Sequence, residues 1–258
     1  MEHILHGLMI CADTILTILV RKPLKHIKVL GALVLPIALF FFITTLPYNP
    51  FQWILGQAVV HEKLWAQFLA YFFLDGLAPL YFLFAAVVSM IHMLNQLAGA
   101  NKSLAQDFTK ALRFMKRTWY VWTALLAGVY ALKYSSLILP GFLDTISPLL
   151  KGGFLFVALM SFAPFVITSR PLNALQNSFE LFKKDPLLSL ALGVAGLLVT
   201  AFATYLANAF FEMIIRVTAN APPKVQMLIN AGAMDVLYMF LFSLVSVSAY
   251  KFLNSWHS

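Results

Sequence analysis

The sequence predicts an all-α membrane protein with six transmembrane helices. Hydrophobic residues make up 61% of the 258 residues and charged residues only 11%. The mean hydropathy is +0.84, above what a chain with a fully water-facing surface carries. Apolar runs recur at about the length, roughly 20 residues, that crosses a hydrocarbon core about 30 Å thick. The runs show no period-2 alternation of apolar and polar residues, so helices are favoured over strands.

The six predicted spans share one composition, with long apolar stretches and few charges. They are 29–46, 66–93, 119–139, 153–169, 187–211 and 227–251. If the N-terminus is cytoplasmic, all but five of the 18 Lys and Arg residues lie on or beside cytoplasmic segments. By the positive-inside rule, both termini are therefore expected in the cytoplasm.

Three amphipathic segments, at 1–20, 102–117 and 171–184, are too polar to cross a membrane, and each precedes a pair of spans. In the middle segment, the apolar residues at helical spacing are Leu104, Phe108, Ala111, Leu112 and Met115. Charged residues at other positions of that segment include Lys102, Asp107, Lys110, Arg113 and Arg117. The chain is therefore predicted to be one membrane domain, 1–258, built as three repeats of an amphipathic cytoplasmic helix plus a helical hairpin, approximately 1–93, 94–169 and 170–258.

Basic residues cluster at the ends of these amphipathic segments, where a helix lying in the interface meets lipid headgroups. The candidate contacts with anionic headgroups are Arg21, Lys22, Lys110, Arg113, Lys116, Arg117, Lys183 and Lys184. The net charge of +8 then reflects topology and lipid contact, and nucleic acid is not an expected partner. The alternative for these charges is that they only set topology during insertion.

Three ionisable residues, Asp75, Lys133 and Asp235, fall inside predicted spans and at similar depth in the outer half of the membrane. Charges within a membrane usually find a partner or a wet cavity. Two interpretations stay open. The three residues form an ion pair or cluster that fixes helix order, or they form a site for a solute or a proton.

Span 187–211 carries a packing signal of small residues that repeat with a spacing of three and four. The seam consists of Gly193, Gly196, Thr200, Ala203 and Ala207. Small residues on one face allow another helix backbone to approach closely, so this seam is predicted to be a helix contact.

The sequence contains no G-x-S-x-G motif and no glycine-rich phosphate-binding loop. The segment HEKLW, 61–65, begins like a zinc-protease helix but lacks the second histidine. The six histidines are scattered and mostly near membrane edges, where polar anchors are expected rather than metal ligands. No metal, no cofactor and no enzymatic activity is predicted, and the single cysteine, Cys11, is expected to fill a small apolar space.

The segment APFVITSRPLNALQNSFELFKKD, 163–185, joins a proline-bearing inward span to an amphipathic helix with a basic end. Together with the order of elements and ILPGF at 138–142, it resembles the YciC-like family of bacterial inner-membrane proteins, which is related to the membrane domain beside some glycerophosphodiester phosphodiesterases. The resemblance implies a six-span protein of the bacterial inner membrane and no catalytic residues.

Two functions remain open. One is a non-enzymatic membrane component that organises lipid or a partner protein at the cytoplasmic face. The other is a small-solute or proton transporter or channel that uses Asp75, Lys133 and Asp235. The first is favoured because the spans are strongly apolar and few polar residues follow any one face, whereas transporters usually have broken helices and polar groups near the midplane.

Overall fold

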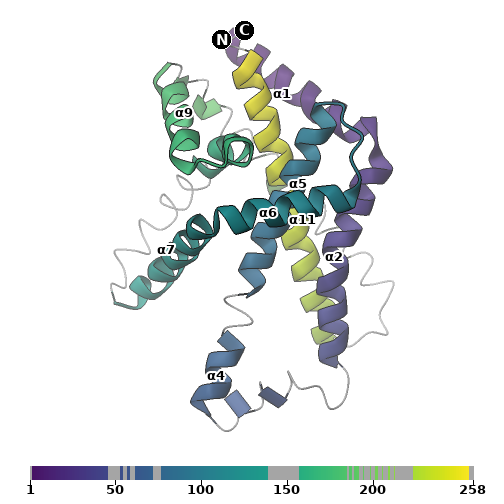
Figure 1. Cartoon of the computed structure of the whole chain (residues 1–258), viewed down its shortest axis with the longest axis vertical. Helices are drawn as coiled ribbons and strands as arrows, with labels where there is room; N and C mark the ends of the chain where they lie inside the picture. The colour runs from purple at the N-terminus through teal and green to yellow at the C-terminus, as the bar shows by residue number, and fades with distance from the viewer. Residues whose placement is uncertain are drawn as a thin grey trace.

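The computed structural model confirms the all-α class (Figure 1). It describes residues 2–45, 53–54, 57–58, 62–71, 77–138, 157–184 and 223–255, and isolated positions between 186 and 212. Throughout this part of the chain the regular structure is helical, and no strand occurs.

The helix bounds follow the sequence closely. The labelled helices are α1 (Glu2–Arg21), α2 (Pro23–Thr45), α4 (Leu64–Tyr71), α5 (Ala78–Leu97), α6 (Leu104–Arg117), α7 (Trp119–Ile138), α9 (Pro171–Lys184) and α11 (Pro223–Ser255). A further helix covers Val157–Thr168. The predicted amphipathic segments are helices α1, α6 and α9, and the predicted spans 29–46, 119–139 and 227–251 correspond to α2, α7 and α11.

Within the described residues, one helix, Pro79–Leu97, is both long and apolar enough to cross a membrane, and Val157–Thr168 is a shorter apolar helix. Predicted span 66–93 corresponds to two helices, α4 and α5, and residues 72–76 between them lie outside the described residues. Pro79 lies in the first turn of α5, where a proline costs no hydrogen bond because the first N–H groups of a helix have no partner within it.

The core is built around α11, which packs against α5, α2 and α1. Its buried side chains include Phe240, Leu244 and Val247, spaced by four and three residues so that they share one face. They pack with Met90 and Met93 of α5, and all five side chains are less than 4% exposed. In Figure 1, α1 and the end of α11 meet at one end of the molecule, where both chain termini lie.

Serines of α11 hydrogen-bond to the backbone of neighbouring helices. The Ser243 hydroxyl donates to the Ala86 carbonyl oxygen at 3.0 Å. The Ser246 hydroxyl donates to the Leu159 carbonyl oxygen at 2.6 Å and accepts from the Ala163 amide at 3.3 Å. Because serine is small, these bonds hold helix backbones close together.

The corner between α5 and α6 is fixed by its backbone chemistry. Gly99 has φ +68°, a conformation that favours glycine at the end of a helix. Four residues later, the Ser103 hydroxyl accepts from the Gln106 amide at 3.4 Å, and the Gln106 side chain accepts from the Ser103 amide at 3.1 Å. This capping box starts α6, which runs across the direction of α5 in Figure 1.

Large apolar side chains also lie on the outside of the helices. On α1 they recur at helical spacing and include Leu5, Met9, Leu16 and Val20, and on α2 they are Leu24, Ile27, Leu35 and Leu39. Each of these side chains is at least 50% exposed. The helices are therefore apolar toward their surroundings as well as toward the core.

Replacing Ser246 by Ala should lower the free energy of unfolding by about 0.6–1.7 kcal/mol, the range for hydrogen bonds between membrane helices. The measurement is thermal unfolding in detergent micelles. Ser248→Ala is the matched control, since the Ser248 hydroxyl is buried on the same helix but donates only within it, to the Leu244 carbonyl oxygen. Equal losses in the two variants would contradict the role of Ser246 between helices.

Candidate functional site

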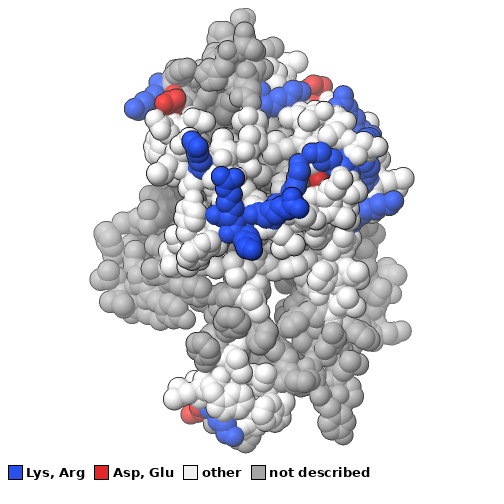
Figure 2. Space-filling model, viewed as in Figure 1, with Lys and Arg blue, Asp and Glu red and all other residues white. Residues whose placement is uncertain are grey.

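Helix α6 presents a basic hollow. Lys110, Arg113 and Arg117 are spaced by three and four residues, so they share one face of the helix. With Asn95 of α5 and Ser169 they line a cavity of about 390 Å³. The remaining lining residues are apolar: Ile91, Leu94, Phe114, Val166 and Ile167. Figure 2 shows blue side chains gathered over α6 on the face toward the viewer.

A sharp turn at Ser169 positions the second wall of the hollow, which consists of Val166, Ile167 and Ser169. Ser169 has φ +58°, a left-handed conformation that is uncommon for a residue with a side chain. Its amide donates to the Phe165 carbonyl oxygen at 2.8 Å, which ends the helix Val157–Thr168. The Arg170 amide donates to the Thr168 hydroxyl at 3.3 Å, and α9 begins at the next residue.

Positive charge is crowded at the start of this face. The pKa of Lys110 is lowered from its ordinary value by a hydrogen bond with the Lys102 side chain, then by burial and by the charge of Lys102, while Asp107 acts in the opposite direction. A bound anion would relieve this repulsion. Because the hollow offers cations and hydrogen-bond donors, it suits a phosphate-bearing anion.

Exposed apolar and aromatic side chains occur on α6, at the start of α7 and in the lining of the hollow. Leu112, Trp119 and Tyr120 are 61%, 65% and 50% exposed, and Ile167, which lines the hollow, is 46% exposed. Trp and Tyr are enriched where a membrane meets water because their rings have an apolar body and a polar edge. Helix α6 and the start of α7 therefore carry side-chain types that are common at a lipid interface.

The other predicted headgroup residues whose side chains are described do not line this hollow. Arg21, Lys116 and Lys183 are exposed at other places on α1, α6 and α9. Lys22 donates to the Asn101 side chain at 3.4 Å, in the turn that precedes α6. Lys184 belongs to α9, but its side chain lies outside the described residues.

The predicted intramembrane cluster is described only at Asp235, which is exposed on α11. Lys133 lies on α7, but its side chain is outside the described residues, as is the whole of Asp75. The predicted seam also lies outside the described residues at all five positions: Gly193, Gly196, Thr200, Ala203 and Ala207.

A chain of buried polar side chains lies beside the hollow. His26 Nε2 is 2.8 Å from the Ile18 carbonyl oxygen, and His26 Nδ1 is 3.1 Å from His92 Nε2. His92 Nδ1 is 3.2 Å from Asp107 Oδ2, and Asn95 donates to Asp107 Oδ1 at 2.6 Å. His26, His92 and Asp107 are 5%, 3% and 1% exposed. The network joins α1, α2, α5 and α6.

This network was not predicted from the sequence. Asp107 was expected on the polar face of the amphipathic segment, but the buried residues of α6 are Asp107, Ala111 and Phe114. The histidines were expected to be anchors at membrane edges, whereas His26 and His92 are buried against each other. The available signal was a single acidic residue in an otherwise basic segment, together with a histidine inside an apolar span.

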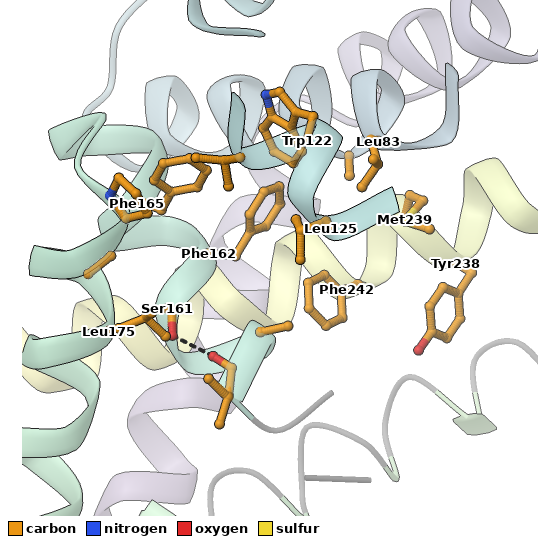
Figure 3. A pocket seen from close by; sticks show the side chains of 16 residues that line it. Leu83, Trp122, Leu125, Ser161, Phe162, Phe165, Leu175, Tyr238, Met239 and Phe242 are labelled. Carbon is orange, nitrogen blue, oxygen red and sulfur yellow. Dashed lines mark hydrogen bonds between the residues drawn. The ribbon is translucent and has the colours of Figure 1, made fainter. Parts of the chain in front are cut away.

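A second, almost wholly apolar cavity of about 290 Å³ lies among α5, α7, α9, α11 and the helix Val157–Thr168. Figure 3 shows Phe162, Leu125 and Phe242 around it. Its lining residues Trp122 and Phe165 also contact Phe114 of the basic hollow, with ring centroids 6.0 and 5.1 Å from that of Phe114. An aromatic cluster thus joins the walls of the basic hollow and the apolar cavity.

In the described part of the chain, no group of three or more His, Cys, Asp or Glu residues is arranged to hold a metal ion. No protein-family profile matches the sequence, no curated protein is significantly similar to it, and no solved structure matches the chain.

Lys102→Gln should move the pKa of Lys110 upward toward its ordinary value, because the substitution removes the main cause of the lowering. The pKa is measurable by NMR of isotope-labelled lysine side chains as a function of pH. Lys28→Gln, an exposed change on α2, is the control. An unchanged Lys110 titration in Lys102→Gln would show that the two side chains do not interact.

Proposed function

We propose that the chain is a six-span, non-enzymatic membrane protein that holds anionic phospholipid at the cytoplasmic face, with α6 as the headgroup-binding helix. The observation that carries this proposal is the basic hollow, where Lys110, Arg113 and Arg117 surround one cavity next to exposed apolar side chains. By binding lipid there, the protein organises the surrounding membrane or a membrane-protein partner.

The membrane location is supported by the exposed stripes on α1 and α2. In water, apolar surface that stays exposed forgoes a burial free energy of about 25 cal/mol per Å². Exposed apolar patches of this extent are rare on soluble monomers. In lipid they face acyl chains at no such cost. The apolar helix Pro79–Leu97, the helices found at other predicted spans and the resemblance to the YciC-like family all support the six-span arrangement in a bacterial inner membrane.

Anionic phospholipid fits the hollow better than nucleic acid does. A phosphate group fits the cations and donors of a cavity of about 390 Å³, and the exposed Leu112 and Trp119 beside it suit acyl chains and the membrane interface. A nucleic acid docking on α6 would meet the same apolar side chains with its charged backbone. The transport alternative depends on Asp75, Lys133 and Asp235, and the exposed position of Asp235 gives it no specific support.

The combined variant Lys110→Gln, Arg113→Gln and Arg117→Gln should lose most of its co-purifying anionic lipid. Each basic residue near an anionic surface is worth about 1 kcal/mol, so the loss is up to about 3 kcal/mol if the contributions add. Native mass spectrometry of the protein released from nanodiscs of mixed phosphatidylglycerol and phosphatidylcholine measures the retained lipid.

The matched control removes the same charge from exposed positions that do not line the hollow: Lys28→Gln, Lys116→Gln and Lys183→Gln. It should retain anionic lipid nearly as the unmodified chain does. If the first variant inserts in the same orientation and retains as much anionic lipid as the unmodified chain, the α6 cations serve only to set the topology. Equal losses in both variants would show a diffuse charge effect without a site.

The six-span topology predicts which loops are accessible from each side. In a Cys11→Ser background, single cysteines at Gln57 and Asp144 should react with a membrane-impermeant reagent from outside, and those at Lys102 and Lys183 only from the cytoplasm. Because Cys11 is the single cysteine of the chain, each introduced cysteine is then the only thiol that can react. Labelling of Lys102 or Lys183 from outside would overturn the orientation.

A further inference from the structure

We propose that His26, His92 and Asp107 form a proton-binding site that holds one exchangeable proton and through it ties α1, α2, α5 and α6 together. The inference rests on the hydrogen-bond geometry of the buried network and is independent of the lipid proposal. Its ligand is a single proton, shared among the three side chains.

The proton count follows from the contacts. The network has three contacts in series, from the Ile18 carbonyl to His26, from His26 to His92, and from His92 to Asp107, with distances of 2.8, 3.1 and 3.2 Å. Each contact needs one proton between its two heavy atoms. Two neutral imidazoles supply one ring proton each, and a carboxylate supplies none. Filling all three contacts therefore requires one additional proton.

The surroundings place this proton on His92. Asp107 accepts a second hydrogen bond from Asn95 at 2.6 Å and lies near the start of α6, where the helix dipole favours a negative charge. The pKa of His26, which precedes predicted span 29–46, is lowered by burial and by the charge of His92, although its contact with the Ile18 carbonyl acts in the opposite direction. His92 is then the imidazolium, His26 is neutral with its proton on Nε2, and Asp107 is ionised.

Loss of the proton leaves one contact unsatisfied. If His92 keeps the proton on Nδ1 for Asp107, its bare Nε2 faces the bare Nδ1 of His26. If His92 keeps the proton on Nε2, its bare Nδ1 faces the carboxylate. Either arrangement sets two acceptors against each other in a buried site, where an unpaired polar group is costly. Deprotonation therefore weakens the junction between the α1–α2 pair and the α5–α6 pair.

In the part of the chain that the structure describes, few other groups contact the network. Lys110, one turn along α6, acts electrostatically on Asp107. From α11, the ring of Phe240 packs edge-on against His26 with the centroids 5.9 Å apart. From α1, the described contact is the Ile18 carbonyl oxygen. Within the described residues, the titratable groups of the site are therefore the two histidines and Asp107, with Lys110 as the neighbouring charge.

The test is ¹⁵N NMR of histidine-labelled full-length protein in nanodiscs over a range of pH, with signals assigned from His26→Gln and His92→Gln. In the unmodified chain at pH 6, His92 should be protonated on both nitrogens and His26 on Nε2 alone. As the pH rises, the two signals should change in one shared step, because coupled groups titrate as a unit. Separate titrations, or a neutral His92 at every pH, would overturn the proposal.

Asp107→Asn provides the decisive variant. Its introduced amide nitrogen can donate to His92 Nδ1, so neutral histidines then fill all three contacts and the fold needs no additional proton. At pH 6 His92 should be neutral with its proton on Nε2, and the shared titration step of the two histidines should be lost. Asp13→Asn, an exposed change on α1, should leave the histidine signals as they are in the unmodified chain. An imidazolium at His92 in Asp107→Asn would refute the proton count, and if that variant fails to fold, the spectra of the unmodified chain still decide.

Discussion

Burial of the Asp107 carboxylate is the constraint on which the α5–α6 corner depends. A carboxylate removed from water must be paired or neutralised, and Asp107, at 1% exposed, obtains its partners from α5. His92 in turn contacts His26 of α2, and His26 contacts the Ile18 carbonyl oxygen of α1. Since Asp107 is in the first turn of α6, this pairing fixes how the helix is rotated. The rotation in turn decides which of its side chains line the hollow.

Helix α6 uses its periodicity to present three different surfaces within one short segment. Asp107, Ala111 and Phe114 form the buried face. Lys110 and Arg113 line the hollow. Lys110 is three residues beyond Asp107, and Arg113 is two residues beyond Ala111. Leu112 is turned outward. The helix therefore places a buried carboxylate, two cations and an exposed apolar side chain within about two turns.

Composition and apolar periodicity were sufficient to predict the helical class and the bounds of α6 and α9 to within two residues, because both depend on local patterns. They were not sufficient for the rotation of α6. Leu112 belonged to the predicted apolar stripe but is exposed, and Asp107 belonged to the predicted polar face but is buried. A pattern of apolar residues does not reveal that a carboxylate will meet a histidine of another helix. His26 and His92, separated by 66 positions, are brought together only by the tertiary fold.

The central position of α11 has a consequence for the order in which the molecule can be assembled. A ribosome produces α1, α2 and α5 long before it produces the helix against which all three pack. Until α11 arrives, the carbonyl oxygens of Ala86 and Leu159 lack the serine hydroxyls that bond to them in the finished protein. The part of the core that packs on α11 can therefore form only after this helix, the most C-terminal of the described helices, has been synthesised.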